Sequence, residues 1–128
     1  MRILDRDFLT FDDVIMVPQY SSIASRGLVD LKTRIGTLEL SLPIISANMD
    51  TITGPAMFEA MRAAGGYGYL HRFADFDTRF QWGLQGYPVT VGVGKTDYDL
   101  VRELSKEIVR PTEFCVDIAH GDSKAPGS

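Results

Sequence analysis

The sequence is poor in cysteine, histidine and tryptophan, and it contains no long apolar run. Its single cysteine, Cys115, excludes a disulfide within the chain and is typical of a reducing compartment, so we expect a cytoplasmic protein. No apolar stretch approaches the roughly 20 residues of a membrane span, so no membrane association is expected. The start, Met1 to Asp7, carries acidic residues and lacks the apolar segment of a signal peptide.

Basic charge is also scarce, because 13 lysines and arginines stand against 17 aspartates and glutamates. The formal net charge of −4, with no basic run, argues against a nucleic-acid partner. The two histidines, His71 and His120, are too far apart in the sequence to indicate a metal site without further ligands. Hydrophobic residues nevertheless make up 45% of the chain, which is enough for a folded core.

Short apolar stretches alternate with amphipathic ones after residue 40. The apolar stretches predict strands at 42–47, 67–70, 88–93 and 112–118, and the amphipathic ones predict helices at 56–64, 75–85 and 97–109. Three strand–helix units followed by a strand indicate an α/β fold with parallel strands and right-handed crossovers. The alternation alone does not distinguish a barrel from an open, doubly wound sheet.

The helix ends and apolar faces carry their own signals. Pro55 suits a first helical turn, Gly65-Gly66 a helix end, and Asp50-Thr51 or Thr96 a side-chain cap. Helical spacing predicts three apolar faces, made of Met57, Ala60, Met61 and Ala64 in the first helix, Phe76, Phe80 and Leu84 in the second, and Leu100, Leu104 and Ile108 in the third.

The first 40 residues follow a different pattern and are interpreted as an extension ahead of the first parallel strand. Residues 10–14 predict a capped turn or a short helix, and residues 29–35 and 38–42 predict a hairpin around Gly36-Thr37. The tail at 125–128 is small and polar, as a flexible loop or a truncation scar would be. Four parallel strands leave an open edge, so we expect residues 1–124 to be one part of a larger domain.

Polar and glycine-rich residues follow each predicted strand, at the end where α/β proteins bind ligands. These segments are Ser46 to Thr51, His71 to Phe73, Gly92 to Lys95 and Asp117 to Ser123. Asp117 is the strongest single candidate, because a charge at a strand end needs a partner. His71 could instead be an ordinary strand-end histidine, and His120 could simply shape a turn.

Several of these motifs together resemble the IMP dehydrogenase/GMP reductase family. The similar segments are Leu9 to Val14 with Val17-Pro18, Ser25-Arg26 with Val29 to Leu31, Pro43 to Thr51, Gly65 to His71, and Val116 to Ser123. The resemblance implies the N-terminal half of a (β/α)8 TIM barrel acting on purine nucleotides. It also implies a cysteine nucleophile in a loop after the sixth strand, which this chain lacks. No catalytic residue is therefore expected here, and Cys115, inside a predicted strand, is expected to be inert packing.

Site residues follow from the same resemblance. It implies that Ala47, Asn48 and Met49 flank the purine of GMP or IMP, and that Arg72, Asp117, Ile118 and Ala119 meet a nicotinamide cofactor. Ser25 and Arg26 would reach the adenosine end of the cofactor from a neighbouring subunit of a homo-oligomer, a tetramer in the intact family. Arg26 or Arg72 could pair with a 2′-phosphate, which favours NADPH over NAD.

GMP reductase is the better match within the family. Asn48 before Met49-Asp50 and the run His71-Arg72-Phe73 resemble reductases, and only a few residues near Gly86-Tyr87 stand where most dehydrogenases insert regulatory modules. The expected reaction is the NADPH-dependent reductive deamination of GMP to IMP, with the 128 residues alone inactive. The alternatives are an IMP dehydrogenase that uses NAD, or a non-catalytic half-barrel that binds nucleotides and pairs with another copy.

Overall fold

The computed structural model describes residues 9–108 and 113–120, and the chain divides into two units after Asp30. The predicted tail at 125–128 lies outside the described residues. In the part of the chain that the structure describes, no helix is long and apolar enough to span a membrane.

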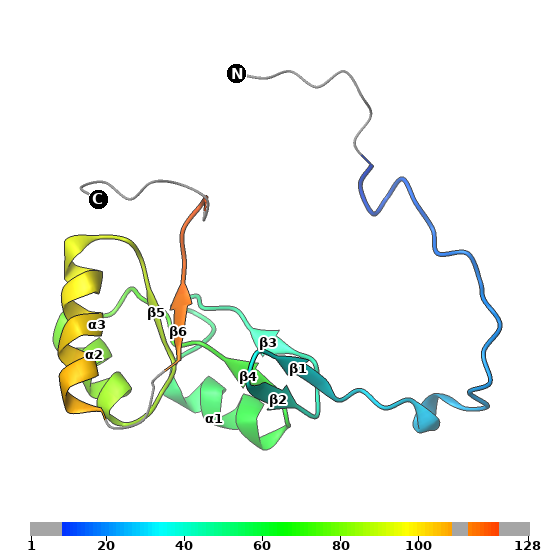
Figure 1. The fold of residues 1–128 in the computed structure, drawn as a ribbon, viewed down its shortest axis with the longest axis horizontal. Helices are drawn as coiled ribbons and strands as arrows, with labels where there is room; N and C mark the ends of the chain where they lie inside the picture. The colour runs from blue at the N-terminus through cyan, green and yellow to red at the C-terminus, as the bar shows by residue number, and fades with distance from the viewer. Residues whose placement is uncertain (1–8, 109–112, 121–128) are drawn as a thin grey trace. The chain divides into compact units, whose positions relative to one another are not determined.

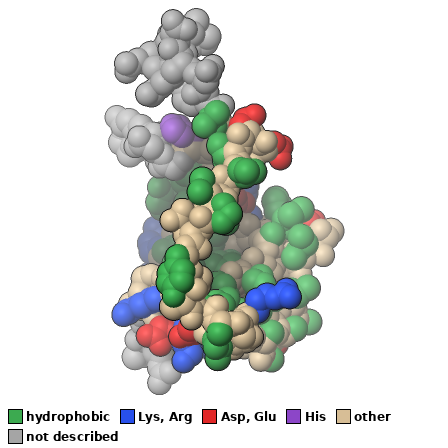
Figure 2. Space-filling model, turned by 90° about the vertical axis from the view of Figure 1, so that its right-hand side faces the viewer, with side chains coloured by type: hydrophobic (Ala, Val, Ile, Leu, Met, Phe, Trp, Pro, Cys, Tyr) green, Lys and Arg blue, Asp and Glu red, His purple; other side chains and the backbone are tan. Residues whose placement is uncertain are grey.

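The described part of the first unit, residues 9–30, begins with a turn. The Thr10 amide donates to the Asp13 carboxylate at 2.8 Å and the Asp13 amide donates to the Thr10 carbonyl at 3.1 Å, so the predicted capped turn is confirmed. A short 3-10 helix, η1 (Arg26–Leu28), follows. Apolar side chains such as Phe11 and Met16 are 98% and 94% exposed. Figure 2 shows hydrophobic side chains spread over the face of the molecule that it presents.

A hairpin opens the second unit. Strands β1 (Thr33–Ile35) and β2 (Leu38–Leu40) pair antiparallel, with Ile35 opposite Leu38. Gly36 takes a φ of 59°, the left-handed region that glycine adopts without strain, which confirms the predicted turn. The strands are shorter than the pattern predicted. Leu40, 3% exposed, is the residue through which the hairpin joins the core.

Four short strands run parallel in the second unit: β3 (Ile45–Ser46), β4 (Tyr67–Gly68), β5 (Val89–Val91) and β6 (Phe114–Val116). Strand β3 pairs with β4, β5 pairs with β6, and a parallel bridge between Leu70 and Val89 connects the two pairs. The spatial order therefore follows the sequence order.

Helices α1 (Pro55–Ala63), α2 (Phe76–Leu84) and α3 (Lys95–Glu107) connect these strands, as Figure 1 shows. The predicted alternation and the parallel pairing are both confirmed. Pro55 occupies the first helical turn of α1 as expected, and the Asp75 side chain caps α2 by accepting from the Thr78 amide at 2.8 Å.

Two predicted caps are wrong. Helix α1 is preceded by Gly54 and α3 by Gly94, and neither helix has a side-chain cap. Thr96 lies inside α3, and Asp50-Thr51 lies in a separate turn closed by the Ile52 amide on the Met49 carbonyl. Glycine satisfies the extended backbone required at a cap position without needing a side chain, so a nearby threonine or aspartate was a misleading signal.

The apolar helix faces predicted from helical spacing are confirmed only where those residues pack against the rest of the fold. Leu100 and Leu104 of α3 are buried against Val89 and Val91, as predicted, and Ile108 packs beside them. Phe76 and Phe80 also pack there, whereas Leu84 is 41% exposed and wrongly assigned. Gly83 takes its place, because a Cβ at Gly83 would come within 2.6 Å of Leu104 Cδ2, so the two helices meet there.

The predicted face of α1 is wrong except at Met61, which is half-buried. Its buried residue is Phe58, whereas Met57 is 40% exposed and Ala60 and Ala64 are exposed. Phe58 meets the rings of Tyr67 and Tyr87 edge to face, at centroid distances of 5.4 and 5.5 Å. This aromatic cluster rotates the helix away from the face that apolar spacing alone selects.

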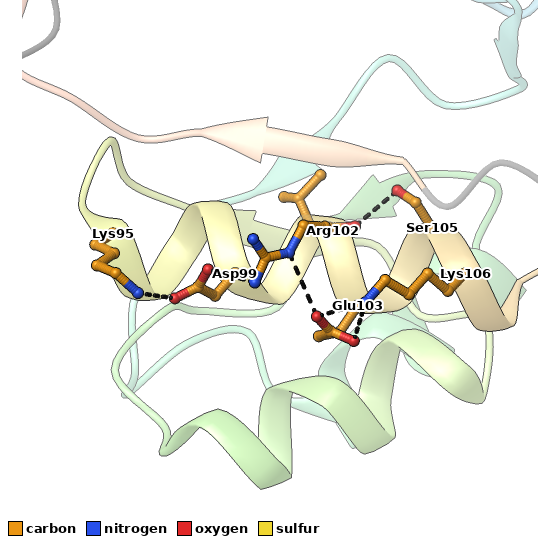
Figure 3. A network of polar contacts seen from close by, with 7 residues as sticks. Lys95, Asp99, Arg102, Glu103, Ser105 and Lys106 are labelled. Atoms are coloured by element: carbon orange, nitrogen blue, oxygen red, sulfur yellow. Dashed lines mark hydrogen bonds and ion pairs between the residues drawn. The ribbon is translucent and has the colours of Figure 1, made fainter. Parts of the chain in front are cut away.

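A buried ion pair joins α2, α3 and β5. Arg79 Nη2 lies 2.5 Å from Asp97 Oδ1, and the two side chains are only 6% and 14% exposed. The same nitrogen donates to the Thr90 carbonyl at 3.0 Å. By contrast, the ion pairs of Lys95, Asp99, Arg102, Glu103 and Lys106 run along the exposed side of α3 (Figure 3).

The substitution Asp97→Ala tests the buried pair. It leaves the Arg79 guanidinium buried without its counter-charge, so we expect the free energy of unfolding in urea to fall by about 3–5 kcal/mol. The matched control is Asp99→Ala on the same helix, where the partners Lys95 and Arg102 are solvent-exposed. Solvent screening makes its expected effect much smaller. Equal losses in the two variants would contradict this account.

Candidate functional site

The strand ends bring two of the predicted site residues into contact. Arg72, after β4, donates from Nε to Asp117 Oδ2, after β6, at 3.1 Å. The Asp117 amide donates to the Val91 carbonyl at 2.8 Å, which fixes the aspartate beside β5. The side chains are 39% and 42% exposed, so both remain open to solvent. The expectation that Asp117 needs a partner is confirmed, and that partner is Arg72.

Gly92 lies beside Arg72 of this pair and closer still to Asp97. A Cβ at that position would lie 3.6 Å from Arg72 Nη1 and 3.0 Å from Asp97 Oδ2. The Arg72 guanidinium also lies over the Phe73 ring, with Cζ 5.2 Å from the ring centroid. The hydrogen bond to Asp117 uses Nε of Arg72, and Nη1 lies beside Gly92.

The segment after β3 holds the three residues expected at the purine. Asn48 is half-buried, Ala47 is exposed and Met49 is 50% exposed. The segment is tied down by Thr53, which is fully buried. The Thr53 hydroxyl donates to the Ala47 carbonyl at 2.5 Å and lies 2.9 Å from the Ser46 hydroxyl oxygen.

His71 serves as a packing residue at the end of β4. Its amide donates to the Thr53 carbonyl at 3.2 Å, and its ring meets Trp82 edge to face at 5.3 Å. Its Nδ1 accepts from the Phe73 amide at 3.3 Å. These contacts favour the interpretation of His71 as an ordinary strand-end histidine.

The remaining predicted residues are divided between the two units. Ile118 is half-buried and Ala119 exposed, directly after Asp117. Ser25 lies in the first unit, where its hydroxyl caps η1 by accepting from the Gly27 amide at 3.3 Å, and Arg26 begins that helix. A role for Ser25 and Arg26 at a cofactor stays a prediction.

Cys115 is half-buried within β6. Burial is the main cause that raises the pKa of its thiol; the Thr90 hydroxyl lowers the pKa by less, and the negative charge of Asp117 adds a still smaller increase. The thiol is therefore protonated at neutral pH, which agrees with the expectation of an inert cysteine.

Sequence reasoning missed Thr53 and the Arg79–Asp97 pair. Thr53 belongs to a Thr51-Ile52-Thr53 run whose polar residues suggest an exposed loop, so its burial leaves no composition signal. Arg79 and Asp97 lie 18 residues apart on two different helices. Only the way α2 packs on α3 reveals that they meet.

The fold and the polar residues at the strand ends define an α/β protein with parallel strands and a candidate ligand site at their carboxyl edge. The model of the IMP dehydrogenase/GMP reductase domain matches residues 8–82. The chain belongs to this family.

The chain is similar both to IMP dehydrogenases and to GMP reductases. The IMP dehydrogenase of Nitrosopumilus maritimus is 49% identical over 53% of this chain and 14% of its own. The GMP reductase of Bacillus subtilis is 31% identical over 90% of this chain and 37% of its own. The crystal structure of the Legionella pneumophila IMP dehydrogenase superposes with a TM-score of 0.74 at 37% identity, covering 91% of this chain and 37% of that one. The chain thus spans less than two fifths of these relatives.

Alkylation of Cys115 tests its protonation. Because the pKa of the folded thiol is raised, we expect iodoacetamide to modify the native chain more slowly at pH 7 than the same chain in urea. The native rate should approach the denatured rate only at higher pH, as followed by mass spectrometry. Modification that is faster in the native state at pH 7 would indicate an activated thiolate instead.

Proposed function

We propose that the chain is the N-terminal half of the (β/α)8 barrel of a GMP reductase. The observation that carries the choice of reductase is the direct connection between α2, which ends at Leu84, and β5, which begins at Val89. Most dehydrogenases of the family insert regulatory modules there. The Bacillus subtilis reductase is similar to this chain over 90% of its residues.

The half-barrel itself is supported by the strand order. Sequential parallel strands with a helix in every connection are the arrangement of a barrel, whereas a doubly wound sheet reverses its order. An apolar groove of about 480 Å³ lies beside the last strand and is lined by Val91, Tyr98, Val101, Phe114 and Val116, among others. Such a groove suits the packing of a further strand–helix unit. On this proposal residues 1–124 belong to one catalytic domain.

The residues at the strand ends fit a nicotinamide cofactor. Asp117 offers a half-exposed carboxylate that can accept hydrogen bonds from ribose hydroxyls. Arg72 uses only its Nε on Asp117, so its terminal nitrogens can pair with a 2′-phosphate, which suits NADPH. Ile118 and Ala119 would contact the same cofactor. When bound, NADPH supplies the hydride for reduction of the purine.

Purine binding is assigned to the segment after β3, where Ala47, Asn48 and Met49 would flank the base of GMP or IMP. The exposed side chain of Met49 offers an apolar surface to a purine ring, and the Asn48 amide can both donate and accept. Ser25 and Arg26 would reach the adenosine end of the cofactor from a neighbouring subunit. The nucleophilic cysteine of the family would come from a part of the enzyme that is not in these 128 residues.

An IMP dehydrogenase is the second candidate. It is favoured by the 49% identity to the Nitrosopumilus maritimus enzyme over 69 residues, the highest identity among the relatives described above. The site residues would then serve the opposite direction of hydride transfer, from IMP to NAD. The two candidates differ in cofactor and in reaction direction.

Nicotinamide absorbance decides between them. We expect the longest natural polypeptide that contains this chain to consume NADPH with GMP, and to form no NADH from IMP and NAD. The 128 residues alone should be silent in both assays. NADH formation from IMP would identify a dehydrogenase, and turnover by the isolated 128 residues would overturn the assignment of the nucleophile to another segment.

Asp117→Ala in the active polypeptide tests the cofactor site. Loss of a charged acceptor should raise the KM for NADPH by about 10-fold or more, because such hydrogen bonds contribute about 1.5–3 kcal/mol. The KM for GMP should change little. The control is Asp99→Ala on the exposed side of α3. Unchanged cofactor kinetics in Asp117→Ala would remove Asp117 from the site.

A further inference from the structure

Thr53 connects the two strand ends to which the proposed function assigns the substrate and the cofactor. It lies between β3 and α1 and is fully buried, although it is polar. Its hydroxyl reaches back to the Ala47 carbonyl and the Ser46 hydroxyl, while its backbone carbonyl accepts from the His71 amide. One residue therefore contacts both segments, through different groups.

The side chain of Thr53 fixes the direction in which the chain leaves β3. The hydroxyl holds the carbonyl of Ala47, and the Thr53 amide donates to the Met49 carbonyl at 2.9 Å. Residues 47–49 are thus held from both ends in a closed turn. Asn48 and Met49 emerge from this turn, so their positions depend on the Thr53 hydroxyl.

Close packing keeps Thr53 in one place. A Cβ at Gly68 would come 2.3 Å from the Ser46 hydroxyl oxygen and 3.1 Å from Thr53 Cγ2. Glycine at this position of β4 therefore lets Ser46 and Thr53 lie directly against the neighbouring strand. A loop held in this way loses little further freedom when a ligand binds.

We propose that Thr53 is a positioning residue that holds Ala47, Asn48 and Met49 ready for the purine nucleotide through its buried hydroxyl. This inference rests on the proposed function. The hydroxyl of Thr53 is expected to affect only the purine-binding segment, because Thr53 contacts His71, the neighbour of Arg72, through its backbone carbonyl. Removing the hydroxyl should therefore weaken purine binding selectively, with the cofactor side intact.

The test compares Thr53→Val with Thr53→Ser in the longest natural polypeptide that contains this chain. Valine keeps the shape and removes the hydroxyl, whereas serine keeps the hydroxyl. We expect Thr53→Val to raise the KM for the purine nucleotide by about 10-fold or more, since small misplacements of a binding group are costly. The KM for the cofactor should stay within about twofold, and Thr53→Ser should stay close to the parent enzyme in both constants.

Thr90→Val is the matched control. Thr90 is also a fully buried threonine, but it lies in β5, and the polar side-chain group beside its hydroxyl is the thiol of Cys115. Its substitution should leave the purine KM unchanged. Should Thr53→Val fail to fold, Ser46→Ala removes the neighbouring hydroxyl without adding bulk. It should raise the purine KM by about threefold with the cofactor KM unchanged, as the loss of one neutral hydrogen bond implies.

A purely structural role for Thr53 would lower the thermal midpoint and the yield of active enzyme but leave both KM values in place. That result would overturn the inference, as would equal kinetic losses in Thr53→Val and Thr53→Ser. An unchanged purine KM in Ser46→Ala, where Thr53→Val does not fold, would overturn it too. If the parent polypeptide binds neither GMP nor IMP in calorimetry, the proposed function fails and this inference fails with it. Purine binding that is insensitive to Thr53 overturns the inference alone.

Discussion

The buried ion pair between Arg79 and Asp97 sets the geometry of the second half of the described fold. It joins α2 to the start of α3, and the same guanidinium holds the backbone of β5 through the Thr90 carbonyl. A charge pair with so little exposure tolerates little displacement, because either partner alone would be buried without compensation. The close contact of Gly83 with Leu104 brings the same two helices together.

That geometry extends to the candidate site through Gly92. Asp97, held by Arg79, and Arg72 both lie close to the position that a Cβ at this glycine would take. Arg72 in turn reaches Asp117 across β5, whose Val91 carbonyl accepts from the Asp117 amide. A structural ion pair inside the helix layer and an open ion pair at the strand ends are therefore neighbours. The first gives rigidity, and the second offers charged groups that a ligand can engage.

Local sequence signals were sufficient for the order of elements and insufficient for their contacts. The alternation of strands and helices, the hairpin at Gly36 and the burial of Leu100 and Leu104 follow from periodicity and turn chemistry. The buried faces of α1 and α2 do not follow from periodicity. Phe58 is buried because it packs against Tyr67 and Tyr87, and Gly83 lies in the helix contact because Leu104 packs against it. The predicted caps of α1 and α3 are wrong for a related reason, since glycine can precede a helix without any side-chain signal.

In the candidate site too, the sequence predicted individual residues but not the contacts between them. Motif resemblance selected Arg72 and Asp117 separately, but nothing in the sequence states that residues 45 positions apart form a pair. The pair matters for chemistry, because a half-exposed carboxylate and guanidinium neutralise each other until a ligand supplies replacement partners. Surface pairs of this kind contribute little to stability, so opening one costs little. On the proposed function, a ligand that brings hydroxyl donors for Asp117 and an anion for Arg72 would replace both halves of the pair at once, and the ribose and 2′-phosphate of NADPH combine these two features.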